Sequence, residues 1–169
     1  TKYGIAKSLN LIEGMFAFAF YDMENDKIYL ARDRVGEKPL YYHLSSNIFF
    51  FSSQLKAIRK LPFNFDLNKN SINLFLKYNY IPSPSSIFSN LNKLPPASYL
   101  EINFIKSEKR LTYSDPIKYW DFRKNYEKNN SNYKNITTSE LKDHLSNSVA
   151  KQLISDVEVG CFLSGGIDS

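Results

Sequence analysis

Apolar positions in the first fifty residues follow the two-residue period of β-strands. Residues 14–22 place phenylalanines on one face and alanines with a tyrosine on the other, which predicts a strand buried on both faces. A turn signal at Asn25 and an apolar run over residues 27–32 predict a hairpin. Residues 39–44 and 48–52 predict a second hairpin.

The period then lengthens. Apolar residues three or four positions apart predict short helices over residues 55–61 and 72–79, and residues 97–102 return to a strand pattern. A run of strands followed by short helices predicts a mainly antiparallel α+β domain, with more strands upstream of residue 1.

A polar stretch rich in Asn, Lys and Tyr, residues 121–136, lacks apolar periodicity and predicts an interdomain linker. Thr137 and Glu140 have the spacing of a capping box. An apolar residue then recurs every four positions, which predicts a helix with an apolar inner face; these residues are Leu141, Leu145, Val149 and Leu153. Residues 157–163 predict a buried strand. The expected domains are therefore residues 1–120 and 137–169, joined by that linker.

Composition changes this picture little, since 43% hydrophobic and 23% charged residues are ordinary for a globular chain. The formal charge is +5, but the lysines are scattered, which favours a solvated surface over nucleic-acid binding. No apolar run approaches the ~20 residues of a membrane span, and residues 1–8 lack the apolar core of a signal peptide. We therefore expect a cytoplasmic protein with neither nucleic-acid nor membrane partners. A single cysteine excludes an intrachain disulfide and a cysteine-based metal cluster.

The sequence Ser164-Gly-Gly-Ile-Asp-Ser169, placed directly after an apolar strand, is an anion-binding pattern. Glycines allow backbone N–H groups to approach phosphate oxygens, and a following helix N-terminus favours negative charge. Ser164 and Ser169 add hydroxyl donors, and Asp168 can orient the loop or reach a magnesium ion. The Gly-Lys-Ser/Thr ending of a Walker loop is missing, so γ-phosphate chemistry is not indicated.

This loop resembles the pyrophosphate loop of the ATP pyrophosphatase family, whose members activate a carboxylate or carbonyl as an adenylate and release pyrophosphate. The resemblance implies one group of residues that binds pyrophosphate and a second group that makes weaker contacts with the nucleotide. It assigns no metal ligand. The first group is Ser164, Gly165, Gly166, Asp168 and Ser169, and the second is Phe162 and Leu163. The loop alone leaves GMP, NAD, argininosuccinate and tRNA-lysidine synthetases open.

The upstream segments narrow this choice, because they resemble the glutaminase domain of class II asparagine synthetases in the same order along the chain. These segments are Glu13-Gly-Met-Phe-Ala-Phe-Ala, Arg32-Asp-Arg-Val-Gly-Glu-Lys-Pro-Leu-Tyr-Tyr42, Leu55-Lys-Ala-Ile58, Tyr80-Ile-Pro-Ser-Pro84 and Lys93-Leu-Pro-Pro-Ala-Ser-Tyr-Leu100. The resemblance covers essentially all 169 residues. It implies an α+β, N-terminal-nucleophile hydrolase type αββα sandwich, incomplete at its N-terminus. The first helix and strand of an α/β adenine-nucleotide domain follow.

For function, the resemblance implies a carbon–nitrogen ligase that hydrolyses glutamine and uses ATP and Mg2+ to amidate aspartate through an aspartyl-adenylate. It allows a homodimer. A related amidotransferase acting on another carboxylate, such as a sugar acid, is one alternative, and a non-catalytic scaffold or interaction module is another. Gln54 stands where the family usually has Glu, and Ala97 where it usually has Gly.

The nucleophile of that family is an N-terminal cysteine, so we expect no catalytic residue in this chain. The chain begins at Thr and ends inside a motif, and we therefore expect it to be an internal fragment. Thr1 is expected to be a truncation point, and Cys161 a packed core thiol. The isolated chain is expected to show neither glutaminase activity nor measurable ATP affinity.

The densest charge cluster is expected to hold a loop through local ion pairs rather than to bind a substrate carboxylate; its members are Arg32, Asp33, Arg34, Glu37 and Lys38. His43 and His144 are expected to be structural or solvated, and Trp120 to anchor the linker.

Overall fold

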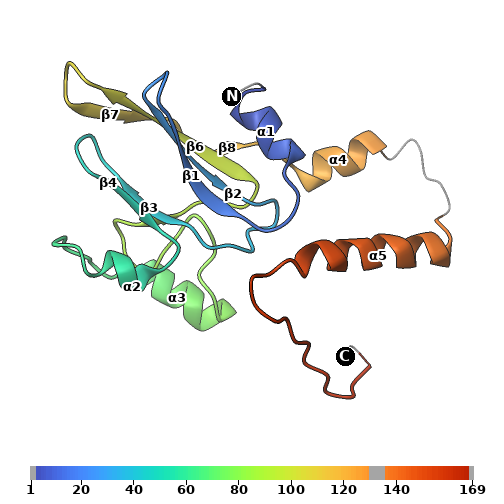
Figure 1. Ribbon diagram of the computed structural model, residues 1–169. Helices are drawn as coiled ribbons and strands as arrows, with labels where there is room; N and C mark the ends of the chain where they lie inside the picture. Colours follow the sequence, from blue (N-terminus) through green and yellow to red (C-terminus); the bar gives the residue numbers. More distant parts are fainter. Residues whose placement is uncertain (1–2, 130–135, 168–169) are drawn as a thin grey trace. The chain divides into compact units, whose positions relative to one another are not determined.

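The computed structural model describes residues 3–129 and 136–167 (Figure 1). They belong to two units, residues 1–126 and 127–169. The helices are α1 (Ile5–Leu11), α2 (Leu55–Ile58), α3 (Lys69–Tyr78), α4 (Phe122–Asn129) and α5 (Thr138–Gln152). The strands are β1 (Ala17–Asp22), β2 (Lys27–Arg32), β3 (Tyr41–Leu44), β4 (Phe49–Ser52), β5 (Asn92–Lys93), β6 (Ser98–Ile105), β7 (Arg110–Tyr113) and β8 (Ile117–Lys118).

The first unit contains two antiparallel sheets. One has the order β1-β2-β6-β7, with β8 also paired to β6, and the other has the order β4-β3-β5. The register of β1 and β2 places Ala17 opposite Arg32 and Asp22 opposite Lys27. β3 and β4 pair in the same way, from Tyr41 opposite Ser52 onward. Both predicted hairpins are confirmed, and the fold is a mixed α/β arrangement with antiparallel sheets.

Side chains from both sheets share one apolar core. Leu30 of β2 and Leu100 of β6 contribute from the first sheet, and Tyr42 of β3 contributes from the second. Leu40 and Leu94, which flank β3 and β5, complete its centre. Burial of this size is the main favourable term in folding, and it fixes the two sheets against each other.

The opposite face of the first sheet carries helix α1, whose Leu9 packs with Ala31 and Tyr99. Leu30 and Ala31 are neighbours in β2 and point into different cores, so β2 is buried on both faces. The prediction that residues 14–22 would be buried on both faces is wrong. Among the described strands β1 pairs with β2 alone, and its Phe20 and Tyr21 are 40% and 52% exposed.

The predicted linker also contains a helix. α4 begins after Asp121, whose carboxylate accepts a hydrogen bond from the Arg123 N–H at 2.9 Å. Phe122 and Tyr126, one turn apart, stack with ring centroids separated by 6.1 Å. An aspartate cap and an aromatic pair at this spacing favour a helix, which the lack of apolar periodicity did not predict. The role of residues 121–136 as a linker stays a prediction. Residues 130–135 lie outside the described part of the chain.

Helix α5 of the second unit has the predicted capping box. The Thr137 hydroxyl accepts from the Glu140 N–H at 3.2 Å, and the Glu140 carboxylate accepts from the Thr137 N–H at 2.8 Å. The predicted apolar face is present but is not buried in this structure, since about half of each side chain remains exposed; its residues are Leu141, Leu145, Val149 and Leu153.

Candidate functional site

Residues 157–163, which precede the glycine loop, form no strand. The prediction of a buried strand is therefore wrong here. A strand needs a partner to receive its backbone hydrogen bonds, and no strand is present among the described residues of the second unit. For the same reason the segment has no core to enter, and Cys161, expected as a packed thiol, is exposed.

The glycine loop is described as far as Ile167, and Asp168 and Ser169 lie outside the described residues. The Ser164 hydroxyl accepts a hydrogen bond from the Gly166 N–H at 3.4 Å. Gly165 has φ +78°, a left-handed conformation that glycine adopts at little cost. A Cβ at Gly165 would meet nothing within 4 Å, so the tip of the loop is open.

A left-handed glycine followed by a second glycine is a backbone pattern found in anion-binding loops. In this structure the Gly166 N–H donates to the Ser164 hydroxyl, so a phosphate oxygen would have to replace that contact. The assignment of Ser164, Gly165 and Gly166 to pyrophosphate binding stays a prediction. Phe162 and Leu163, predicted to make weaker nucleotide contacts, are exposed.

A magnesium site is not formed by the described residues alone. Across residues 3–129 and 136–167, no group of three His, Cys, Asp or Glu side chains is arranged to hold a metal ion. The predicted carboxylate, Asp168, lies outside this range.

Two members of the densest charge cluster, Arg32 and Asp33, form a buried structural feature of the first unit, which we call the Arg32–Asp33 hub. Each nitrogen of the Arg32 guanidinium donates to a different backbone carbonyl. The acceptors are Lys38 O at 2.7 Å from Nε, Leu94 O at 2.7 Å from Nη1 and Gly36 O at 2.6 Å from Nη2. Burial lowers the pKa of Arg32, while the Asp33 carboxylate opposes this shift. The guanidinium thus connects the loop after β2 to the segment between β5 and β6.

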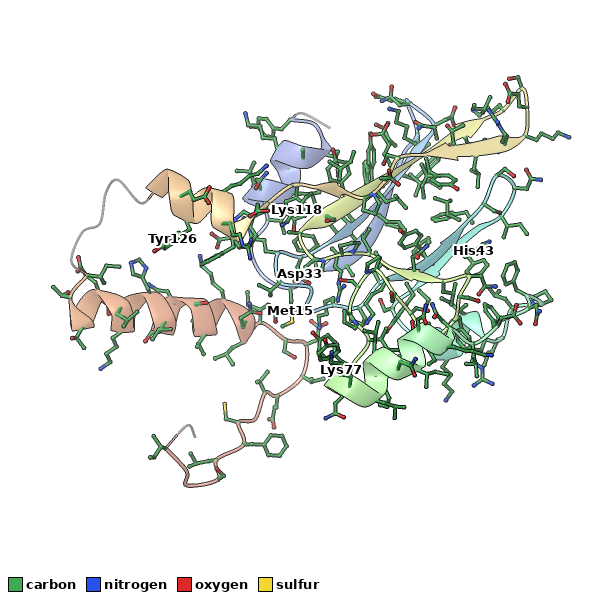
Figure 2. All side chains as sticks on the ribbon, turned by 180° about the vertical axis from the view of Figure 1, so that it is seen from behind. Met15, Asp33, His43, Lys77, Lys118 and Tyr126 are labelled. Carbon is green, nitrogen blue, oxygen red and sulfur yellow. The ribbon has the colours of Figure 1, made fainter. Side chains whose placement is uncertain are left out.

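Asp33, the neighbour of Arg32 and labelled in Figure 2, accepts hydrogen bonds from the backbone of the same region. It is 1% exposed and receives four backbone N–H groups. The donors are Phe16 at 3.3 Å, Val35 at 3.2 Å, Glu37 at 2.9 Å and Lys38 at 3.0 Å. Charge-assisted bonds of this kind are about twice as strong as neutral ones.

The expectation that this cluster is structural agrees with these contacts, but the expected mechanism is wrong. Within the described chain, none of its five residues forms an ion pair. The side chains of Arg32, Asp33 and Arg34 bond to backbone groups instead. Gly36 explains the tight geometry, because it has φ +73° and a Cβ there would lie 2.8 Å from Pro96 Cγ. Buried backbone groups need partners, and charged side chains supply them at close range.

Tyr119 joins the hub from the end of β8. Its hydroxyl donates to the Arg32 carbonyl at 3.0 Å. Burial raises the pKa of Tyr119 to about 12, with Arg34 opposing the shift. Since the neutral phenol is favoured in the folded state, this group contributes stability below the ordinary tyrosine pKa of about 10 and loses it as the pH rises toward about 12.

We predict that Tyr119→Phe lowers the free energy of unfolding by about 1 kcal/mol at neutral pH, because it removes one hydrogen bond. The wild type should lose free energy of unfolding between about pH 8 and about pH 11, and Tyr119→Phe should lose less over the same range. Urea unfolding followed by circular dichroism at the two pH values measures both effects. Tyr113→Phe, at an exposed position of β7, is the matched control. Equal alkaline loss in Tyr119→Phe and wild type would contradict the assignment.

The two histidines differ in their surroundings. His43 Nδ1 lies 2.7 Å from Asn90 O, and its ring packs on Phe50 and Phe63 with centroids 5.0 and 4.7 Å away. It is structural, as expected. His144 is on an exposed position of α5. Trp120 is partly buried, with its ring centroid 6.3 Å from that of Phe122, at the start of the predicted linker.

Sequence reasoning missed two features of the first unit. The first is that Asp33 bonds to backbone N–H groups, although an aspartate before a Gly-containing turn is a known signal of such contacts. The second is a pocket beside α2, with three cationic side chains on its rim. Its signal was the sequence Leu55-Lys-Ala-Ile-Arg-Lys-Leu61, which has three basic residues and no acidic one. Thr1, the rejected nucleophile, lies outside the described residues.

Among the described helices, none combines the length and the apolar character that crossing a bilayer requires.

Two protein families match the chain in tandem. The family described as glutamine amidotransferase domain matches residues 1–120, and the family described as asparagine synthase matches residues 140–169.

Curated relatives match nearly the whole chain. A Methanocaldococcus jannaschii protein, provisionally named asparagine synthetase (glutamine-hydrolyzing) 2, is 37% identical over 162 residues, covering 92% of this chain and 29% of its own. Asparagine synthetase (glutamine-hydrolyzing) 1 of Bacillus subtilis is 30% identical over 164 residues, covering 94% and 24%. The asparagine synthetase of Rattus norvegicus is 27% identical over 174 residues, covering 99% and 28%. The chain thus spans less than a third of the length of each relative.

Proposed function

The chain belongs to the glutamine amidotransferase domain family, and from this premise we propose that it is part of a glutamine-dependent asparagine synthetase. In the proposed reaction, water releases ammonia from the side-chain amide of glutamine and leaves glutamate. ATP transfers its AMP group to the side-chain carboxylate of aspartate and releases pyrophosphate. Ammonia then displaces AMP from the aspartyl-adenylate and gives asparagine.

The observation that carries this proposal is the order of the two family matches on one chain. A glutaminase-type region is followed by an asparagine synthase region, and the glycine loop lies in the second. A nitrogen source and an ATP-dependent activating site are the two parts that such a reaction needs. The names of the relatives support aspartate as the acceptor over another carboxylate, and they do not favour a non-catalytic scaffold.

The proposed domains are residues 1–120 for the glutaminase region, 121–136 for the linker and 137–169 for the start of the ATP-binding region. The division of the structure after Tyr126 supports a boundary in this interval. For the first region we propose an N-terminal-nucleophile hydrolase type sandwich, supported by two antiparallel sheets that share a core. An α/β adenine-nucleotide fold for the second region rests on the family match alone.

In the proposed enzyme, Ser164, Gly165 and Gly166 hold the pyrophosphate group with backbone N–H and hydroxyl donors. Catalysis by such a loop consists of positioning ATP and stabilising negative charge on the leaving pyrophosphate. Asp168 and Ser169 are proposed to complete the loop. Phe162 and Leu163 are proposed to lie beside the nucleotide. Magnesium would supply further charge neutralisation on the phosphates, with Asp168 as its candidate ligand.

None of the 169 residues is proposed as the glutaminase nucleophile. Cys161, the only cysteine, belongs to the second unit and lies three residues before Ser164, not at an N-terminus. A cytoplasmic location and a homodimer stay predictions.

The acceptor is tested by product analysis with the full-length protein. With glutamine and ATP present, aspartate should yield asparagine, AMP and pyrophosphate, while a uronic acid should yield no amide. Amide formation on the uronic acid but not on aspartate would contradict the proposal and favour the alternative of an amidotransferase that acts on a sugar acid.

A further inference from the structure

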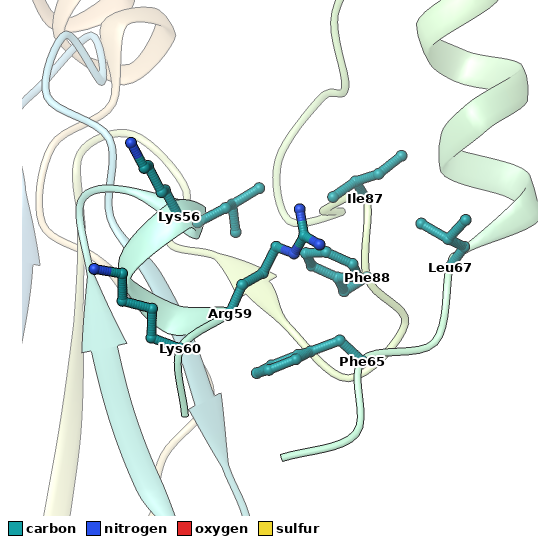
Figure 3. A pocket seen from close by; sticks show the side chains of 8 residues that line it. Lys56, Arg59, Lys60, Phe65, Leu67, Ile87 and Phe88 are labelled. Atoms are coloured by element: carbon teal, nitrogen blue, oxygen red, sulfur yellow. The ribbon is translucent and has the colours of Figure 1, made fainter. Parts of the chain in front are cut away.

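A pocket of about 900 Å3 lies on the first unit beside helix α2 (Figure 3). Its apolar wall comes from three separate segments of the chain. Leu55 lies on α2, Phe65 and Leu67 lie before α3, and Ile87 and Phe88 lie in the loop that leads to β5. Volumes of roughly 300–1,000 Å3 and mainly apolar walls are typical of small-molecule sites.

The floor of this pocket is held in place by the core beneath it. Phe88 is 9% exposed and belongs to the cluster of Ile58 and Leu91, onto which Phe65 also packs. The Phe65 ring lies 5.4 Å from the rings of both Phe63 and Phe88. Because these aromatic side chains pack against one another, the apolar surface is preformed, and a ligand would spend little free energy on ordering it.

The rim carries three cations, Lys56, Arg59 and Lys60. In the described part of the chain, none of them has a carboxylate within the 4.0 Å of an ion pair. Gln54, which precedes the helix, is neutral. In Figure 3 the Arg59 side chain extends from α2 toward Phe88 and Ile87, whereas Lys56 and Lys60 extend away from the phenyl rings. Arg59 is therefore the cation that faces the apolar floor.

We propose that this pocket binds a small carboxylate with an apolar body, whose carboxylate pairs with Arg59 and whose body covers Phe65 and Phe88. The planar guanidinium presents two parallel N–H donors that match the two oxygens of a carboxylate. Lys56 and Lys60 add positive potential at the entrance and favour an anion over a neutral ligand. The apolar body gains free energy from leaving water for the phenyl surface.

The pocket is distinct in its chemistry from the glycine loop, which offers donors but no apolar floor. It is also unsuited to free glutamine or aspartate, because their ammonium groups would meet three unpaired cations. A ligand with one negative charge and no positive one fits both the rim and the wall.

The test uses the 169-residue chain and two probes of nearly equal shape, 4-phenylbutyrate and its neutral amide. Calorimetry should detect saturable binding of the carboxylate and at least about tenfold weaker binding of the amide. Methyl resonances of Leu67 and Ile87 should shift with the carboxylate. Arg59→Gln should weaken binding at least about tenfold, and Lys77→Gln, on the exposed surface of α3 outside the pocket, should leave it unchanged.

Arg59 is exposed, so its replacement should leave the fold intact, which the circular dichroism spectrum checks. Three outcomes would overturn the proposal: no saturable binding, equal binding of carboxylate and amide, or unchanged binding in Arg59→Gln. Tighter binding of an acidic peptide at the same methyl groups would also overturn it and assign the pocket to a protein partner. Because the glycine loop takes no part in any of these measurements, their result does not depend on the proposed synthetase activity.

Discussion

Asp33→Ala is expected to lower the free energy of unfolding of the first unit by about 3–5 kcal/mol, because it leaves several buried backbone donors without an acceptor. The side chain is 1% exposed and accepts from four backbone N–H groups. Alanine leaves these donors buried without an acceptor. Since a domain of this kind is stable by only about 5–15 kcal/mol, most of the margin should disappear.

Urea unfolding followed by tryptophan fluorescence and circular dichroism measures this loss, with Trp120 as the only reporter ring. Asp33→Asn should fall between wild type and alanine, because its amide keeps one acceptor oxygen but turns an N–H toward donors. Asp115→Ala, at an exposed position between β7 and β8, is the matched control and should have little effect. A stability of Asp33→Ala within about 1 kcal/mol of wild type would refute the role of the hub.

In the proposed full-length enzyme, Gly165→Ala is expected to reduce ATP-dependent asparagine formation about 100-fold, a loss typical of one misplaced donor in a site that stabilises developing charge. Gly165 has φ +78°, which an alanine adopts only with strain. The backbone would relax toward negative φ and turn its N–H groups away from pyrophosphate. Glutamine hydrolysis should continue, because it takes place in the other domain.

The readouts are pyrophosphate release and glutamate formation in the same reaction. Gly160→Ala provides a matched glycine control, since Gly160 lies outside the left-handed region and a Cβ there meets nothing within 4 Å. It should keep both activities. Equal loss in the two variants, or full pyrophosphate release by Gly165→Ala, would argue against the proposed loop function.

Local patterns predicted local structure well. Both hairpins follow from two-residue periods and turn residues, and the capping box at Thr137 and Glu140 follows from spacing alone. These features depend on neighbours in sequence, which a single chain displays directly.

Features that depend on distant partners were predicted less well. The apolar segment 157–163 carries a strand pattern, but a strand forms only where another strand receives its hydrogen bonds. The exposure of Cys161 and of Phe20 has the same origin, because burial depends on what covers a residue rather than on its type. Asp33 was expected to have a structural role together with its charged neighbours, yet only the fold shows that its partners are backbone N–H groups.

The candidate sites also differ in how far the sequence could predict them. Ser164, Gly165 and Gly166 could be proposed from sequence because the donors of an anion-binding loop lie next to one another along the chain, and their role stays a prediction. The pocket beside α2 was not identified, because Arg59, Phe65 and Phe88 come from separate segments that only the fold brings together.

The most direct test of the proposed function is to follow nitrogen from glutamine labelled with 15N in its side-chain amide. The full-length protein, supplied with this glutamine, aspartate and ATP, should place the label in the side-chain amide of asparagine and form AMP and pyrophosphate in equal amounts. Label that appears only as free ammonium, or ATP that is cleaved to ADP and phosphate, would contradict the proposal that this chain belongs to a glutamine-dependent asparagine synthetase.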